Sequence, residues 1–269
     1  DALQVHLNIS LGERERNELK KKRVRQAKER AVTGFAAHIG HGSLEAGMAT
    51  RLVDISRIDA RSYYDLQVSK NKAATVGRKF GDLQSVYNKG MLEYELVGTK
   101  ADPFAGIRNK RLEARTSCDR RSFKPSELIE YKANIMTRNE QLKIIGLLMV
   151  ETGCRIEEAA GLLVEDVDLS SNIPHIKIRN NTLRGLDKKG LERSCALVGD
   201  ALTALQSYTL PENRKSPLFP RYGKPSGATN VSAALNKVIR KSLKISDKSL
   251  VAYSTRHTFA DRCRAAGVD

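Results

Sequence analysis

A short apolar run, with a glycine and an arginine directly behind it, constrains this chain more than any other feature. Residues 143–150 read KIIGLLMV, which is typical of an apolar helix, and Gly153 can end that helix in a left-handed conformation. Arg155 then lies in the turn before a second short helix, with a rigid element on each side. Its guanidinium stays charged and offers a planar set of donors that matches phosphate oxygens. From this stretch alone, an ordinary surface arginine at a helix start is an equal alternative.

Positive charge is spread over the whole chain. The 269 residues hold 47 Lys and Arg against 31 Asp and Glu, a formal net charge of +16, and are enough for two modest domains. Residues 1–115 contain 22 basic and 14 acidic side chains, and residues 116–269 contain 25 and 17, so each part carries +8. This distribution favours a protein that grips a polyanion with two lobes. Charge alone does not separate DNA, RNA and a membrane surface.

The sequence predicts neither a membrane span nor a metal site. Its apolar runs are shorter than a bilayer span, and its first residues do not resemble a signal peptide. The four cysteines are far apart, without a Cys-x-x-Cys pair or a histidine at ligand spacing. We therefore expect no zinc, no disulfide framework and no cofactor. The expected protein is soluble and intracellular, with cysteines that act as small buried side chains.

The first part of the chain is expected to be helical. Residues 13–40 combine apolar side chains at helical spacing with a basic run, which predicts one helix with a basic outer face. The DNA contacts expected from this run are Lys20, Lys21, Lys22 and Arg23. A solvated helix face is the alternative for such residues. Further helices are expected over residues 58–68 and 76–94, and the aromatic side chains of the second are assigned to the core.

A linker separates this part from the second. Residues 105–123 are polar and basic without a sustained period, so the domain boundary is placed near residue 115. The second part mixes helix and strand signals. Helices are expected over residues 127–135, 200–208, 230–243 and 250–266, and short strands over 167–169, 175–178 and 194–198. The pattern predicts a mostly α chain with a small antiparallel sheet, an α+β domain.

Two motifs carry a resemblance to a known family. Residues 152–159 read TGCRIEEA and residues 253–260 read YSTRHTFA. Together they resemble the two arginine motifs of the tyrosine recombinase (phage integrase) family, T-G-x-R-x-x-E-A and H-x-x-R-H-T-F-A. Their order, and the strand hairpin between them, strengthen the match. The resemblance implies a helical core-binding domain over 1–115, with a linker to about 123, followed by a catalytic domain over 116–269 that is incomplete at its C-terminus.

The resemblance assigns Arg155 and Arg256 to the scissile phosphate. A five-coordinate transition state develops charge on the non-bridging oxygens, which two fixed guanidinium groups stabilise better than mobile lysines do. Glu158 matches the family's acidic residue and is interpreted as an orienting partner of the first arginine. His257 also matches and is expected to make a structural or backbone contact. Tyr253 stands where the family usually has histidine; a tyrosine, with an ordinary pKa of about 10, is a poor base but a good donor to a phosphate.

The family also places a lysine on the hairpin between the second and third strands, where it protonates the leaving 5′ oxygen. The matching stretch is residues 184–197, and the lysine column falls on Asp187, a carboxylate that would repel phosphate. We expect Lys188 to take this role, with Lys189 as the second candidate. The alternative, that both are solvated loop lysines, stays open. Arg184 is expected to contact DNA.

The family's nucleophilic tyrosine follows the second arginine, whereas all eight tyrosines of this chain precede Arg256. We therefore expect the full-length protein to be a recombinase and these residues alone to be inactive in cleavage. Whether the missing tail reflects a shortened chain, an unrecorded segment or a natural remnant stays open.

Three alternative functions are considered for this chain. The first is a site-specific recombinase that cuts and rejoins double-stranded DNA through a 3′-phosphotyrosyl link, without metal or ATP. It would act as a homotetramer at the nucleoid in the bacterial cytoplasm, with an accessory DNA-bending protein as an optional partner and no membrane contact. The second is a degenerate relative that occupies an attachment site as a regulator, which Asp187, Tyr253 and Ala196 favour. The third, a metal-dependent nuclease, needs clustered carboxylates for two cations, and only Glu157-Glu158 and Glu165-Asp166-Asp168 come close.

Overall fold

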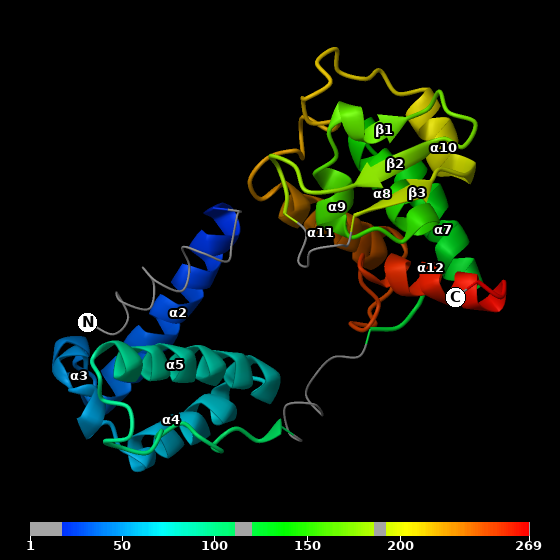
Figure 1. Ribbon diagram of the computed structural model, residues 1–269. Coiled ribbons are helices and arrows are strands. Elements are labelled where there is room, and N and C mark those ends of the chain that lie inside the picture. Colours follow the sequence, from blue (N-terminus) through cyan, green and yellow to red (C-terminus); the bar gives the residue numbers. More distant parts are fainter. Residues whose placement is uncertain (1–17, 111–119, 186–191, 269) are drawn as a thin grey trace. The chain divides into compact units, whose positions relative to one another are not determined.

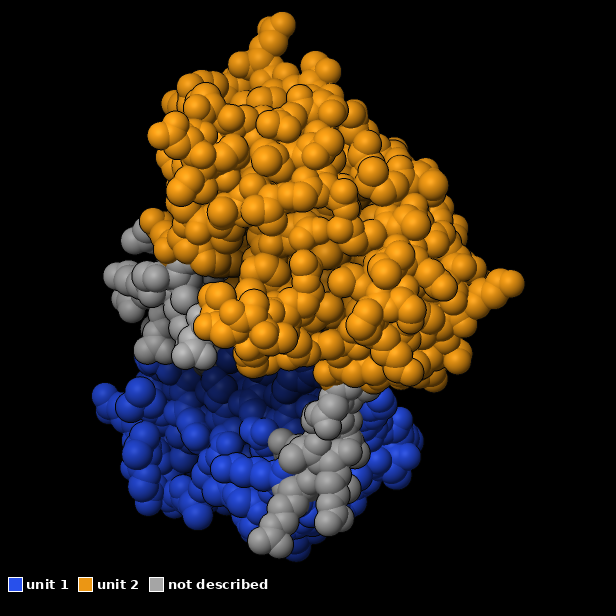
Figure 2. Space-filling view, turned by 90° about the vertical axis from the view of Figure 1, so that its right-hand side faces the viewer, with its two compact units in different colours: residues 1–117 blue, residues 118–269 orange. Residues whose placement is uncertain are grey.

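The chain forms two compact units, residues 1–117 and 118–269 (Figure 2). The computed structural model describes residues 18–110, 120–185 and 192–268. None of the helices in these ranges is both long enough and apolar enough to cross a membrane. The roles assigned to the two parts of the chain, DNA binding and catalysis, remain predictions.

Unit 1 is helical in all of its described elements. These are α2 (Glu18–Ile39), α3 (Leu44–Ala49), η1 (Leu52–Asp54), α4 (Arg57–Lys70) and α5 (Ala73–Glu93) (Figure 1). Aromatic rings fill its core: Phe35 of α2 packs edge to face on Tyr63 of α4 and on Phe104, with ring centroids 5.4 and 5.3 Å apart. Phe80 and Tyr87 of α5 are buried in the same cluster, as predicted for the aromatic side chains of this helix. Tyr94, just beyond α5, differs and is 43 % exposed.

Helix α3 has no counterpart among the predicted helices. Ser43 caps it by accepting a hydrogen bond from the backbone nitrogen of Ala46 at 3.2 Å. A Cβ atom at Gly47 would lie 1.8 Å from the carbonyl oxygen of Ala36, so glycine allows α3 to lie directly against α2. Six residues with a glycine among them are too few to display a helical period.

Unit 2 joins a small sheet to a group of helices. Its helices are α7 (Pro125–Met136), α8 (Glu140–Thr152), α9 (Ile156–Ala160), η2 (Val164–Asp166), α10 (Gly199–Gln206), α11 (Gly227–Lys237), η3 (Val238–Ser242) and α12 (Ser254–Ala265). Its strands are β1 (Val167–Asp168), β2 (His175–Ile178) and β3 (Arg193–Ala196), which pair antiparallel in the order β1-β2-β3. Ile176 in the middle strand lies opposite Val167 and Cys195. This architecture confirms the predicted fold class.

Helix α8 is the centre of unit 2. Asn139 caps its start by accepting from the backbone nitrogen of Leu142 at 3.1 Å. Every residue from Ile144 to Thr152 is buried, which explains why the run is apolar around its whole circumference. Helices α7, α9, α10 and α12 all contact it (Figure 1). The arginine turn at the end of α8 is therefore attached to a helix that is buried and that four other helices contact.

Some boundaries differ from the predicted ones. Helix α11 begins at Gly227, and at Val238 it passes into a turn of π-helix, η3. Helix α12 begins at Ser254, because the residues before it form turns in which the backbone nitrogen of Leu250 donates to Asp247 and that of Ser254 donates to Val251. Tyr253 is thus the N-cap residue of α12.

Candidate active site

The first arginine motif is built on a glycine that no other residue could replace without strain. Gly153 ends α8 with φ of +61°, a left-handed conformation. A Cβ atom there would lie 2.4 Å from Cδ1 of Phe259, a residue of α12. The missing side chain therefore allows the second arginine motif to pack directly on the first.

Arg155, the N-cap residue of α9, is bound to a buried acid. Its backbone nitrogen donates to Oε2 of Glu158 at 2.8 Å, and its Nη1 donates to Oε1 at 3.0 Å. The Arg155 side chain is 36 % exposed, whereas that of Glu158 is 4 % exposed. Glu158 thus fixes both the backbone and the guanidinium of the first arginine, in line with the orienting role expected from the sequence.

Arg193, the first residue of β3, also contacts the carboxylate of Glu158. Nη2 of Arg193 donates to Oε2 of Glu158 at 2.7 Å, and Nη1 donates to Oε1 at 3.3 Å. Burial alone would raise the pKa of Glu158, but the hydrogen bonds from Arg193 and Arg155 outweigh it and hold that pKa below its ordinary value. Sequence reasoning missed Arg193. The signal available was its place in the stretch 184–197 that matches the family's hairpin, and the acid that it binds lies on another element.

The second arginine motif meets this turn through a hydrogen bond. Nη1 of Arg256 donates to the backbone carbonyl of Gly153, which lies 103 residues earlier in the chain. The acceptor is two residues from Arg155, so folding brings the two predicted arginines to one turn. Farther along α12, Thr258 accepts from the backbone nitrogen of Phe123 at 2.8 Å and donates to the carbonyl of Ser254 at 2.9 Å, which anchors the helix.

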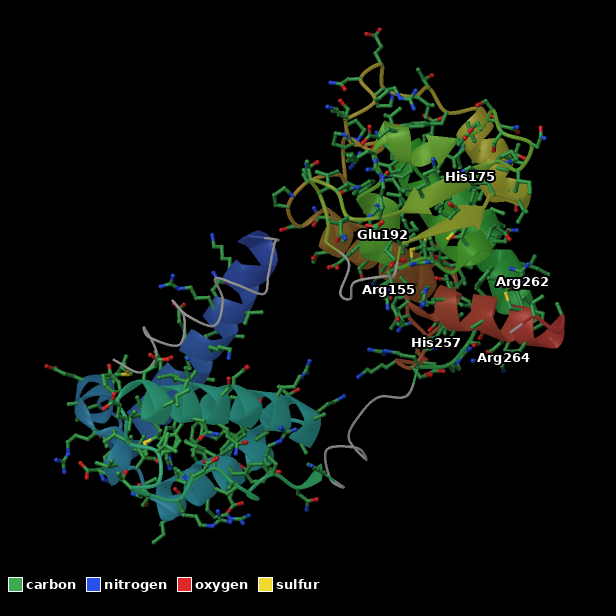
Figure 3. The ribbon with its side chains drawn as sticks, viewed as in Figure 1. Arg155, His175, Glu192, His257, Arg262 and Arg264 are labelled. Carbon is green, nitrogen blue, oxygen red and sulfur yellow. The ribbon has the colours of Figure 1, made fainter. Side chains whose placement is uncertain are left out.

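Two further residues of the motif lie at the start of α12. The ring centroids of Tyr253 and His257 are 5.5 Å apart, in an edge-to-face arrangement. Tyr253 is 38 % exposed, and His257 is half-buried. Figure 3 shows Arg155 beside α9 and His257 on α12, while His175 lies on the sheet. Tyr253 therefore presents its side chain at the surface, beside the helix turn that carries Arg256.

Arg184 is placed differently from the expectation. Its side chain is 5 % exposed, and its guanidinium donates to the backbone carbonyls of Glu158 at 2.6 Å and Arg179 at 3.1 Å. It also lies 3.6 Å from the carboxylate of Asp166. An enclosed guanidinium that is bound to backbone oxygens cannot reach a DNA phosphate. The expected DNA contact does not fit this placement, and Arg184 instead ties the chain after β2 to α9.

Several predicted residues cannot be placed. Lys188, Lys189 and Asp187 lie outside the described residues. In the basic run of α2 the side chain of Lys22 is exposed. The structure does not describe the side chains of Lys20, Lys21 and Arg23.

Of the acidic residues considered for a metal centre, Glu165 and Asp166 are paired with an arginine. Arg179 forms ion pairs of 2.6 Å with Glu165 and with Asp166. Within residues 18–110, 120–185 and 192–268, no three His, Cys, Asp or Glu side chains gather closely enough to hold a metal ion.

Comparison with known proteins identifies the family. The sequence profile described as "Phage integrase family" matches residues 125–269, more than half of the chain. The chain belongs to the phage integrase family. This integrase-family chain is also similar to curated tyrosine recombinases. It is 25 % identical to tyrosine recombinase XerC of Staphylococcus saprophyticus over 219 residues, which cover 78 % of this chain and 69 % of the relative. It is 25 % identical to XerC of Listeria welshimeri over 226 residues, or 80 % and 71 % of the two chains.

Solved integrases have the same fold. A lambda integrase dimer bound to a core site matches 99 % of this integrase-family chain and 87 % of that chain, with a TM-score of 0.70 and 16 % identity. The Tn1549 transposon integrase in complex with transposon right-end DNA matches 100 % and 88 %, with a TM-score of 0.68 and 14 % identity. At these identities the likeness shows the fold alone.

Proposed function

We propose that this protein is a site-specific DNA recombinase that cuts and rejoins DNA through a 3′-phosphotyrosyl intermediate. The observation that carries the proposal is the hydrogen bond from Arg256 to the carbonyl of Gly153, which joins the second arginine motif to the turn of Arg155. Two guanidinium groups held at one turn by hydrogen bonds suit a single phosphate better than two unrelated surface arginines would.

The proposed roles follow from the chemistry of each group. Arg155 and Arg256 bind the non-bridging oxygens of the scissile phosphate and stabilise the charge of the five-coordinate transition state. Tyr253 donates a hydrogen bond to the same phosphate, which its partly exposed position supports. Lys188, with Lys189 as the second candidate, protonates the leaving 5′ oxygen. His257 supports the start of α12.

Double-stranded DNA is the proposed partner. The net charge of +16 supports the binding of a polyanion, and Lys20, Lys21, Lys22 and Arg23 are proposed to contact its backbone. A solved lambda integrase is a tetramer bound to a Holliday junction, with a TM-score of 0.69 to this chain. We extend that assembly to this protein, as a homotetramer on paired sites at the nucleoid, with an accessory DNA-bending protein as an optional partner.

The test is a cleavage assay with the full-length protein on an attachment-site duplex that carries a nick beside the scissile phosphate. The nick releases a short fragment after cleavage, so the covalent protein–DNA product accumulates. We expect a covalent band without added magnesium. Specific binding with no band would instead support a catalytically degenerate regulator, the function that the substitution of the family's histidine by Tyr253 favours.

Arginine variants show whether the assigned residues carry the activity. Arg256→Lys keeps the charge but loses the planar pair of donors, so it should abolish the band and leave DNA binding nearly unchanged. Arg264→Lys is the matched control on the same helix, because Arg264 is 70 % exposed and pairs with Asp261. Equal loss of binding and cleavage in Arg256→Lys, or loss of the band in the control, would contradict the role of Arg256.

A further inference from the structure

One buried carboxylate holds two arginines at the candidate active site. Glu158 is 3 % exposed and accepts four hydrogen bonds, two from Arg155 and two from Arg193. Arg193 is the first residue of β3 and reaches Glu158 across 35 positions of the chain. Its two nitrogens span both oxygens of the carboxylate, the geometry in which a guanidinium fixes the plane of its partner.

The charges of this cluster do not cancel, because two arginines share one carboxylate. A carboxylate that paired with Arg155 alone would balance the charge of that arginine. Arg193 makes one nitrogen-to-oxygen contact with each oxygen of Glu158, and Nη1 of Arg155 donates to Oε1. The group of three side chains keeps a net charge of +1 beside the turn that faces α12.

We infer that Arg193 is a positioning residue for DNA cleavage, which acts through Glu158 to hold the guanidinium of Arg155 in its phosphate-binding orientation. The inference rests on the recombinase function proposed above. A displacement of about 1 Å in a catalytic group can cost roughly 100-fold in rate. A residue that holds Arg155 in place without touching the phosphate therefore affects the rate of cleavage. Arg193 also connects the start of β3 to α9, which fixes the position of the strand relative to the arginine turn.

A direct phosphate contact by Arg193 is the competing role, since its side chain is 33 % exposed. The two roles differ in what happens once Glu158 is neutral. If Arg193 acts by positioning, it has no charged carboxylate to act through after Glu158→Gln. If Arg193 binds the phosphate directly, that contact persists in the Glu158→Gln variant. A direct contact would also add about one unit to the slope of DNA affinity against salt concentration.

The experiment measures cleavage of the nicked duplex by the full-length protein and its variants. We expect Arg193→Gln to slow cleavage by about 10- to 100-fold with unchanged DNA affinity and salt slope. In the Glu158→Gln background, the same change should slow cleavage by less than about 3-fold, because interacting residues are not additive. Lys177→Gln is the matched control, since Lys177 is an exposed residue of β2 and loses the same charge. Arg193→Lys, which retains the charge, should fold readily and give an intermediate rate.

Three outcomes overturn the inference. The first is a wild-type cleavage rate in folded Arg193→Gln. The second is a loss of cleavage rate on adding Arg193→Gln to Glu158→Gln that is as large as the loss in the wild-type background. The third is a reduced slope of DNA affinity against salt concentration in Arg193→Gln. A thermal unfolding scan of each variant confirms that the folded protein is assayed, and if Arg193→Gln unfolds, wild-type cleavage by Arg193→Lys overturns it instead. Failure of the wild-type protein to form any covalent product counts against the proposed function and not against Arg193.

A second measurement needs no cleavage. The carboxyl group of Glu158, followed by NMR as pH is lowered, should titrate at a higher pH in Arg193→Gln than in the wild-type chain, because one of its cationic partners is gone. The charged and titratable groups that face it are Arg155, Arg184, Arg193, Cys154 and Cys195. An unchanged titration would show that Arg193 does not control the state of Glu158.

Discussion

Replacing Gly153 by alanine perturbs the turn that joins the two arginine motifs, and the structure separates its two costs. The first is conformational, because φ is +61° and an L-residue in that conformation costs about 1–2 kcal/mol. The second is steric, because the new Cβ would lie 2.4 Å from Phe259, and overpacking of this kind costs about 1–3 kcal/mol. We therefore expect unit 2 to lose about 2–5 kcal/mol of its free energy of unfolding.

Gly199→Ala is the matched control. Gly199 is also in unit 2 and has φ of +54°, but the atoms nearest to its added Cβ, in Glu151, are at an ordinary distance of 3.9 Å. Only the conformational cost of about 1–2 kcal/mol applies to it. The assay is urea unfolding of both variants followed by circular dichroism. Equal destabilisation would refute the argument that Gly153 is required by the close approach of α12.

Three further predictions concern charged groups, two of them in unit 2 and one in unit 1. The pKa of Glu158 is lower in the folded state than in the unfolded state, so its stabilising effect is complete above the unfolded value of about 4.3 and is lost as pH falls through the folded value. Urea unfolding at a series of pH values should therefore show a steeper acid loss of stability in the wild-type chain than in Glu158→Gln, and parallel curves would contradict this sign. Arg184→Met leaves buried carbonyl oxygens without a donor and should cost about 3 kcal/mol. Lys22→Ala should change stability by less than about 0.5 kcal/mol, yet reduce the salt dependence of DNA binding. Near-wild-type stability of Arg184→Met would argue against a structural role.

Local patterns were sufficient to predict much of the fold. The apolar run before Gly153, the alternation of short strands and the spacing of aromatic residues in α5 each have a local cause in helix capping, strand pairing or core packing. The short helix α3 was missed because six residues hold too little pattern. The start of α12 was placed too early because turns at Leu250 and Ser254 interrupt a sequence that is otherwise compatible with helix.

The candidate site was only partly predictable. The motif resemblance pointed to Arg155, Arg256 and Glu158, but no local pattern links Arg193 to an acid on another element. Arg184 shows the opposite error: a polar, basic stretch suggested an exposed contact, whereas its tertiary surroundings enclose the side chain. Partners that are distant in the sequence decide both cases, and only folding supplies them.

The central claim is that Arg155 and Arg256 act on one phosphate, and neutral analogues of that phosphate test it most directly. A methyl group in place of one non-bridging oxygen removes the charge that the two guanidinium groups are proposed to bind. Cleavage rates of the wild-type protein, Arg155→Lys and Arg256→Lys are compared on the normal duplex and on each methylphosphonate stereoisomer. We expect the loss caused by each substitution to shrink on at least one stereoisomer. Equal losses on all three substrates would show that these arginines do not contact the scissile phosphate.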